Sequence, residues 1–232
     1  MRALKVICGN KLVDLDGGQQ MLPKAGYTER RVFILGETEA HSFTRSWDAG
    51  RFLLPWSYMD PAVASCALNG PRWRYERKKN GREAFAQVPQ TVTLRTGELE
   101  YRDFHDECYG GEQAIEVKRE HSRLEGTAYR VYNRAFLEAN ALEAMNRRTA
   151  YFLLLNATAG FDLGPIEAQV LAAVGEGGDQ SIEAVAAVTG QSAIRVRAAA
   201  LNLWRKGRVD LPMRDSLIDD TWTVKGLSDV ER

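Results

Sequence analysis

The sequence lacks the features that mark several classes of protein. Its three cysteines, Cys8, Cys66 and Cys108, form no C-x-x-C pair, which argues against a disulfide framework and against a structural zinc site. No apolar run approaches the roughly 18 residues of a membrane span, and no apolar segment with a small-residue cleavage site stands at the N-terminus. These absences favour a reducing compartment, and we expect a cytoplasmic protein.

Charge and nucleotide-binding motifs are equally sparse. Lys and Arg number 31, as do Asp and Glu, so contact with nucleic acid would depend on a local basic patch. Neither a Walker A sequence nor a G-x-G-x-x-G stretch is present. The histidines His41, His105 and His121 lack the spacing of metal ligands, and no Ser-His-Asp or Cys-His arrangement emerges from the sequence.

What the sequence does contain is an ordinary share of hydrophobic residues, 44%, in a pattern that changes near residue 160. We expect residues 1–160 to form an α/β domain, a mixed sheet flanked by helices, with residues 1–40 as an N-terminal extension. The expected strands are residues 3–9, 30–35, 84–97, 98–107 and 112–120, the last three as an antiparallel meander. The expected helices are residues 57–69, where Ser57 would be the N-cap, and residues 129–155.

Residues 161–232 indicate a second, smaller domain. Three helical segments punctuated by glycines precede a short strand, at residues 164–180, 181–190, 191–211 and 219–226. Ser181 and Ser192 stand where N-caps of the second and third segments are expected. Three helices with a tight second turn and a β tail are typical of a winged helix-turn-helix.

The stretch "EYRDFHDECYGGEQAIEVKRE", residues 100–120, places carboxylates on both sides of a Gly-Gly turn. Side chains alternate faces along a strand, so Glu116 and Lys118 would project to one side. If the strand of Asp103 pairs with theirs, Asp103 and Glu116 can hold a hard cation such as Mg²⁺. The cation would polarise a phosphate while Lys118 orients a water molecule. The alternative is a solvated strand face whose charges pair without catalysis.

The order of these segments resembles the PD-(D/E)xK nuclease superfamily and, within it, the TnsA family, the endonuclease subunit of heteromeric transposases. The segments that carry the resemblance are "GRFLLPWSYMD", "QVPQTVTL", "EYRDF", "AIEVK", "YRVYNRAFLEANALEAMNR" and "LNLWRKGRVDLPMRDSLIDDTWTV". It covers roughly residues 45 to 225. The fold that it implies is a restriction-endonuclease-like mixed sheet flanked by helices, followed by a small winged-helix domain.

The resemblance also implies a set of site residues. Asp60, Asp103, Glu116 and Lys118 would be catalytic, and Mg²⁺ or Mn²⁺ would be bound by Asp103, Glu116 and the carbonyl of Val117.

Two positions depart from the family pattern, since Arg102 replaces a proline and Asp60 a glutamate. The rivals of Asp60 are Glu39, Asp48 and Glu76, and the rival of Asp103 is Asp106. Asp60 is equally well explained as a helix-capping residue.

Two groups of basic residues are candidates for DNA contact. The stretch "RWRYERKKNGR", residues 72–82, gathers cations around Trp73 and Tyr75, although a solvated loop explains it equally well. The second group lies on or after the expected recognition helix, whose small residues 198–201 we expect to face the core. The candidates are Arg72, Arg74, Lys78, Lys79, Arg195, Arg205 and Lys206.

The function that the resemblance implies is that of a metal-dependent DNA endonuclease. It would nick the non-transferred strand at the 5′ ends of a transposon, with a DDE-type transposase subunit and an AAA+ regulator as partners. A free-standing PD-(D/E)xK restriction or repair nuclease is the alternative enzyme and would cut unaided. The non-enzymatic alternative is a DNA-binding or scaffold protein built on the winged helix.

Overall fold

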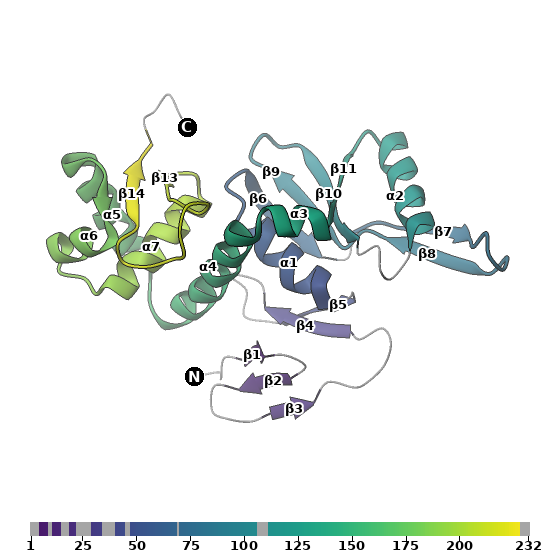
Figure 1. Cartoon of the computed structure of the whole chain (residues 1–232), viewed down its shortest axis with the longest axis horizontal. Helices are drawn as coiled ribbons and strands as arrows, with labels where there is room; N and C mark the ends of the chain where they lie inside the picture. The colour runs from purple at the N-terminus through teal and green to yellow at the C-terminus, as the bar shows by residue number, and fades with distance from the viewer. Residues whose placement is uncertain are drawn as a thin grey trace.

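The computed structural model describes the backbone of residues 5–8, 11–14, 19–21, 29–33, 40–44, 47–68, 70–105 and 111–227, and side chains from Phe52 onward in these ranges, residue 159 excepted. Figure 1 shows an elongated arrangement, with helices α5 (Gly164–Gly177), α6 (Ile182–Thr189) and α7 (Ala193–Arg205) at one end. A hairpin of β7 (Arg72–Glu76) and β8 (Glu83–Gln87) projects at the other.

Five short strands precede the first helix. The first three form an antiparallel sheet in the order β1-β2-β3, and β4 pairs antiparallel with β5. Their bounds are β1 Lys5–Cys8, β2 Lys11–Asp14, β3 Gln19–Met21, β4 Glu29–Phe33 and β5 Ala40–Thr44. The strands expected at residues 3–9 and 30–35 are therefore confirmed as β1 and β4, in separate sheets.

The centre of the molecule is a four-stranded mixed sheet in the order β11-β10-β9-β6. β6, β9 and β10 are antiparallel neighbours, and β11 is parallel to β10. The strands are β6 Val63–Leu68, β9 Gln90–Leu94, β10 Leu99–His105 and β11 Ala128–Asn133. Helix α1 (Trp47–Tyr58) precedes them and α2 (Glu112–Leu124) connects β10 to β11. The expected α/β class, a mixed sheet flanked by helices, is confirmed.

Strand β10 is covered by a different helix on each face. Because side chains alternate along a strand, Glu100, Arg102 and Phe104 face one side and Tyr101 and Asp103 the other. Phe104 lies in a hydrophobic cluster with residues of α1, whereas Asp103 contacts Lys118 of α2. All five side chains are buried, as expected for a strand enclosed between two helical layers.

Three expectations about local structure are wrong. The first concerns residues 57–69, which do not form a helix, because α1 ends at Tyr58 and β6 starts at Val63. Proline disfavours helical backbone in the preceding residue, and Pro61 follows Asp60 directly. The Asp60 Oδ1 accepts a hydrogen bond from the Ala62 backbone N–H at 3.1 Å, so the aspartate closes the turn after α1 rather than the first turn of a new helix.

The larger correction concerns residues 112–120, which belong to helix α2 and not to a strand. The segment "EQAIEVKREHSRL" is rich in Glu, Gln, Lys and Arg, which are strong helix formers. Its buried residues Ile115, Lys118 and Ser122 are spaced three and four apart, which is helical periodicity. The alternation in "AIEVK" is too short to override that pattern.

The next segment shows the opposite difference, because a strand forms where a helix was expected. Residues 129–133, expected to begin a helix, belong to β11, whose β-branched and aromatic residues suit a strand. Helical structure begins only at α3 (Arg134–Ala139), where the Asn133 side chain accepts a hydrogen bond from the Phe136 N–H, and continues in α4 (Ala141–Gly160).

Helix α4 joins the region of the central sheet to the C-terminal helices. It packs against α1 on one side and α7 on another, and one buried hydrophobic cluster extends from Leu54 through Leu154 to Val224. The predicted boundary between residues 160 and 161 falls between α4 and α5, inside this cluster. The division into two domains stays a prediction.

The C-terminal segment contains the three expected helices, α5 to α7, and three short strands in the antiparallel order β12-β14-β13. The strands are β12 Gln180–Ser181, β13 Val209–Asp210 and β14 Thr223–Gly226. The Ser181 hydroxyl caps α6 by accepting a hydrogen bond from the Ala184 N–H at 3.0 Å, as expected. Across the described ranges, no helix combines the length and apolar character that crossing a bilayer requires.

Candidate functional site

Asp103 and Lys118, two of the four residues that the resemblance implies to be catalytic, meet on the α2 face of β10. The Lys118 ammonium forms an ion pair with the Asp103 Oδ2, which also accepts a hydrogen bond from the Tyr129 hydroxyl at 2.9 Å. The Asp103 Oδ1 accepts from the Phe104 N–H. We call Asp103, Lys118 and Tyr129 the Asp103 cluster. The side chains of Asp103 and Lys118 are each 2% exposed, so the ion pair is closed to solvent.

Glu116 lies apart from this cluster. Successive helical residues are about 100° apart, so Glu116 and Lys118 point to nearly opposite sides of α2. The Glu116 side chain is 61% exposed, and its carboxylate lies 3.7 Å from the ammonium of Lys78 on the hairpin. The expectation that Glu116 and Lys118 share a face is therefore wrong, because residues 112–124 are helical.

The three candidate metal ligands do not fit one divalent cation in this arrangement. Both carboxylate oxygens of Asp103 already accept hydrogen bonds, and Glu116 faces solvent. Val117 lies inside helix α2, and backbone carbonyls inside a helix are used in the hydrogen bonds of that helix. Within the parts of the chain that the structure describes, no three Asp, Glu, His or Cys side chains are grouped as a metal site would require. These three residues would have to change their positions before they could share a cation.

Asp60 belongs to a second polar cluster, on the α1 face of β10. The Arg102 guanidinium donates to the Asp60 Oδ2 at 2.8 Å and to the Glu100 Oε1 at 2.6 Å. It also lies 3.4 Å from the Ser57 hydroxyl, which donates to the Gln90 Oε1 at 2.8 Å. These five residues are the Arg102 cluster. Asp60 and Asp103 thus serve different faces of the sheet.

The electrostatics of the Arg102 cluster keep its arginine charged. Burial opposes the charged form of Arg102, but Tyr132, which carries a charge only once it ionises at high pH, and the carboxylates of Asp60 and Glu100 outweigh burial and raise the pKa of the guanidinium above its usual value. Glu100 is shared with the guanidinium of Arg130, at 3.1 Å. The Gln90 Nε2 is fully buried and has no hydrogen-bond partner among the described residues. A fixed internal cation thus stands between two carboxylates.

Sequence reasoning missed Glu100, Gln90 and Tyr129. A usable signal existed for Glu100, because a Glu-x-Arg pair on a strand places both side chains on one face, as Glu100 and Arg102 are here. Gln90 and Tyr129 come from other strands, and no sequence spacing predicts that either residue lies in these clusters.

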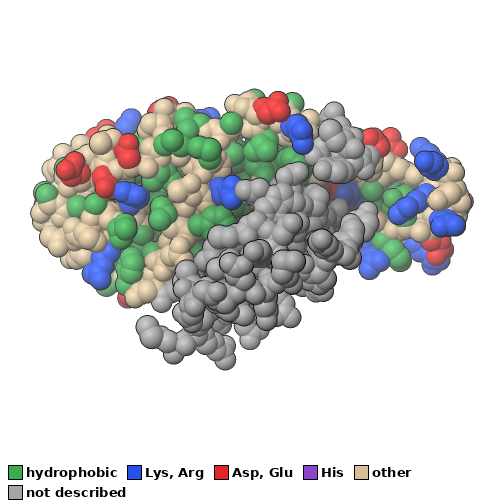
Figure 2. Space-filling model, turned by 60° about the horizontal axis from the view of Figure 1, so that its bottom comes forward, with side chains coloured by type: hydrophobic (Ala, Val, Ile, Leu, Met, Phe, Trp, Pro, Cys, Tyr) green, Lys and Arg blue, Asp and Glu red, His purple; other side chains and the backbone are tan. Residues whose placement is uncertain are grey.

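Of the four candidate DNA contacts at residues 72–79, Arg72 and Arg74 lie on strand β7, and Lys78 and Lys79 lie in the exposed turn that connects β7 to β8. Lys and Arg side chains gather at this end of the molecule (Figure 2). Arg74 forms an ion pair with Glu83 across the two strands, and the Arg72 guanidinium stacks on the Phe85 ring, 3.7 Å from its centroid. The rival acid Glu76 ends β7, and the side chains of Glu39, Asp48 and Asp106 lie outside the described residues.

The three candidate DNA contacts around α7 are engaged within the C-terminal segment. Arg205 donates to the Asn202 side chain at 3.2 and 3.1 Å, and Lys206 pairs with Glu167 at 2.6 Å. Burial, followed by the charge of Arg95, lowers the pKa of Arg205. Arg195 is exposed, 5.2 Å from the Phe161 ring. Residues 198–201 are buried, as expected, which leaves little of α7 for a groove of DNA.

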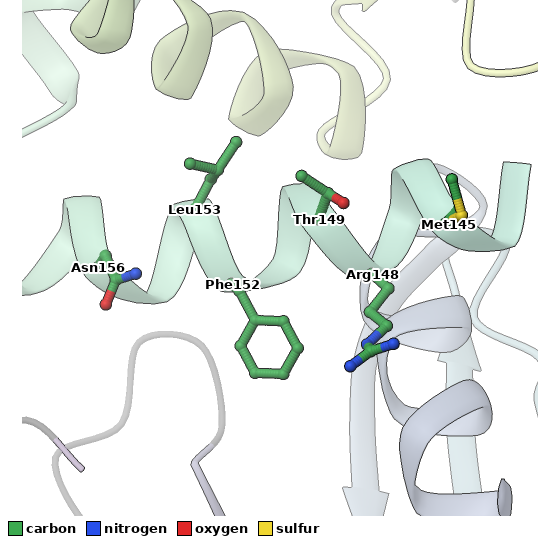
Figure 3. Close-up of a pocket in the computed structure, with 6 residues that line it drawn as sticks. All are labelled: Met145, Arg148, Thr149, Phe152, Leu153 and Asn156. Carbon is green, nitrogen blue, oxygen red and sulfur yellow. The ribbon is translucent and has the colours of Figure 1, made fainter. Parts of the chain in front are cut away.

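A hollow of about 330 Å³ lies beside helix α4. Its lining residues all come from this one helix (Figure 3): Met145, Arg148, Thr149, Phe152, Leu153 and Asn156. None of them belongs to the Asp103 or the Arg102 cluster. The hollow therefore adds no group to the chemistry of either cluster.

Comparison with known proteins adds no relative: no family model matches this chain, and no curated protein matches it in sequence.

Proposed function

We propose that this chain is the DNA endonuclease subunit of a heteromeric transposase, resembling the TnsA family, which nicks the non-transferred strand at transposon 5′ ends. The observation that carries the proposal is the contact between Asp103 and Lys118, an acid and a lysine from separate elements that meet at the centre of the sheet. Burying an ion pair costs desolvation energy and adds little stability, so a functional role would explain why Asp103 and Lys118 are buried together. The proposed setting is the cytoplasm.

The order of elements also supports a nuclease-like core. One helix, three antiparallel strands, a crossover helix and a fourth strand parallel to the third follow one another as α1, β6, β9, β10, α2 and β11. The sheet with its flanking helices agrees with the coarse class that the resemblance implies. The winged-helix assignment of the C-terminal segment is part of the proposal, and its support is the order of three helices and three short strands.

The need for Mg²⁺ or Mn²⁺ belongs to the proposal as well. Glu116 would have to leave its exposed position on α2 before it could share a cation with Asp103. We therefore propose that cleavage depends on double-stranded transposon-end DNA, a DDE-type transposase subunit and an AAA+ regulator. In the structure, the Lys118 ammonium pairs with the buried Asp103 carboxylate.

The test is strand cleavage of a labelled transposon-end duplex with Mg²⁺, with and without candidate transposase and regulator subunits. Asp103→Asn keeps the shape of the side chain and removes its charge, and we expect it to abolish 5′-end nicking while DNA binding persists. Cleavage by the isolated chain would instead favour a free-standing PD-(D/E)xK restriction or repair nuclease.

A second candidate, a non-catalytic DNA-binding or scaffold protein, is favoured by the position of Glu116 outside the Asp103 cluster. It predicts that Asp103→Asn and Glu116→Gln leave the activity of the whole assembly unchanged. Equal cleavage products from wild type and Asp103→Asn in the complete assembly would reject the endonuclease proposal and leave this one.

A further inference from the structure

The β7–β8 hairpin has two different faces. The inner face carries Trp73, whose ring stacks on His121 of α2 with centroids 4.9 Å apart and planes 6° from parallel. The outer face carries Arg72, Arg74 and Phe85, all exposed. The inner face thus attaches the hairpin to the body of the protein, and the outer face is turned to solvent.

The outer face presents a flat stacking surface. Phe85 is 52% exposed, which is unusual for a large aromatic side chain, and the Arg72 guanidinium is centred 3.7 Å from its ring. Phenylalanine rings and guanidinium planes are two side-chain surfaces on which unpaired nucleobases stack. This pair is therefore suited to the face of a base.

The tip of the hairpin supplies the charge. Residues 77–82 hold four cations and no carboxylate: Arg77, Lys78, Lys79 and Arg82. Across residues 72–87, six cations stand against two carboxylates in a chain whose net charge is zero. A cationic tip beside an exposed aromatic ring favours nucleic acid over an acidic protein, because an acidic peptide would use the charge but not the stacking surface.

A second side chain of α2, Gln113, also holds the hairpin in place. The Gln113 Nε2 donates to the Glu76 carbonyl at 2.7 Å, and its Oε1 accepts from the Lys78 N–H at 3.0 Å. A two-point clamp at the start of the tip fixes its direction before any ligand binds. A preorganised arm loses less entropy on binding than a mobile one.

We propose that the β7–β8 hairpin binds duplex DNA at a step where base stacking is interrupted, such as a nick. The tip cations would contact phosphates on both sides of the interruption, and Phe85 with Arg72 would stack on the base exposed there. Away from the ends of a duplex, both faces of each base are covered by neighbours, so an interrupted step is where an internal base offers a free face. This inference rests on the proposed function, because it takes DNA as the substrate and a nick as its product.

The test compares the binding of a short intact duplex with that of the same duplex nicked at its centre, with metal ions chelated so that no cleavage occurs. We expect wild type to prefer the nicked duplex by about tenfold, the scale of one stacked base. Phe85→Ala should remove the preference and leave binding to the intact duplex. Val188→Ala, which shortens another exposed apolar side chain, is the control and should keep the preference.

The charge of the tip is tested separately. Lys78→Gln/Lys79→Gln should weaken binding to both duplexes and reduce the slope of log K against log salt by about 2, one for each phosphate contact. Arg119→Gln/Arg134→Gln removes two exposed charges outside the hairpin and should change the slope less.

Four results would overturn the inference. Equal preference for nicked DNA in wild type and Phe85→Ala would remove the role of the stacking surface. Equal loss of binding in both charge variants would remove the role of the tip. Tighter binding of an acidic polypeptide than of either duplex would assign the hairpin to a protein partner. If wild type bound neither duplex, alone or with partner subunits, the proposed function would fail as well.

Discussion

Lys118 and Glu116 stand two residues apart and differ in almost every physical respect. Lys118 is buried against Asp103, whereas Glu116 is exposed near Lys78. Lys118→Met should destabilise the protein by about 3–5 kcal/mol, because it leaves the Asp103 carboxylate buried without its cation. Urea denaturation measures this change in the free energy of unfolding.

The matched control for Lys118→Met is Glu116→Gln, which should shift the free energy of unfolding by less than about 0.5 kcal/mol, as surface substitutions usually do. Adding Asp103→Leu to Lys118→Met should restore part of the lost stability, since it removes the orphaned charge. Similar losses in Lys118→Met and Glu116→Gln would contradict the helical placement of residues 112–124.

Cys66 is a second residue whose surroundings determine its chemistry. Burial raises the pKa of its thiol to about 12, against an opposing effect of the Arg102 charge. Only the thiolate is nucleophilic, so Cys66 should resist iodoacetamide at pH 8 in the folded protein and react once urea unfolds it. Mass spectrometry in a Cys8→Ser/Cys108→Ser background measures this, and rapid labelling in the folded state would contradict it.

The same shift has a consequence for stability. The unfolded chain loses the Cys66 proton near its ordinary pKa of 9.0, and the folded chain keeps it until about pH 12. Between these values the folded state binds more protons, so this group makes stability fall as pH rises, with no effect well below pH 9. Cys66→Ala should weaken that slope in urea denaturation between pH 8 and pH 10.

At the scale of elements, the caps of α6 and α7 allow a direct comparison. The Ser181 hydroxyl accepts a hydrogen bond from the Ala184 N–H, whereas Ser192 occupies the same position before α7 without such a bond. Ser181→Ala should cost about 1 kcal/mol of stability and Ser192→Ala clearly less. Thermal unfolding measures both, and equal losses would show that the hydrogen bond contributes nothing.

Sequence patterns predict an element well when its periodicity is long and its ends are marked. Helices α5 to α7 have glycines between them, α6 and α7 have serines at their N-caps, and all three helices form where expected. Strand β10 likewise follows from its alternation. The segment around "AIEVK" fails because five alternating residues also fit a helix, and only the contacts of Ile115, Lys118 and Ser122 with the body decide between the two.

The candidate site was predictable only in part, for a related reason. Asp103 and Lys118 do meet, but through a helix crossing over the sheet rather than through a hairpin. The Arg102 cluster draws Ser57 and Asp60 from the end of α1, Gln90 from β9, and Glu100 with Arg102 from β10. Such a cluster exists only after strand pairing sets the register Gln90–Arg102, which no local pattern encodes.

At the scale of the whole molecule, the region of the central sheet is coupled to the C-terminal segment. The Arg95 guanidinium donates to the Pro61 carbonyl at 2.7 Å and to the Arg205 carbonyl at 3.0 Å, so one side chain joins the sheet to the end of α7. The hydrophobic cluster around α4 is shared in the same way. We expect one cooperative unfolding transition rather than two.

Two tryptophans report on this coupling. Trp56 lies on α1, and Trp222 is buried beside β14. Variants in which Trp56 or Trp222 is the single tryptophan should give coincident midpoints of the fluorescence change in urea, because both residues lie in structure that unfolds together. Midpoints that differ, with the Trp222 signal changing first, would establish residues 161–232 as an independent domain.

The place where the β7–β8 hairpin joins the sheet affects how the sequence can evolve. Leu68 and Gln90 are paired partners on β6 and β9, so the hairpin leaves the sheet and returns to it at a single rung. The strands on both sides therefore close without it, much as a hairpin turn would close them. An arm inserted in this way can be lengthened, exchanged or lost while the sheet keeps its register, so a new partner can be acquired there without rebuilding the sheet.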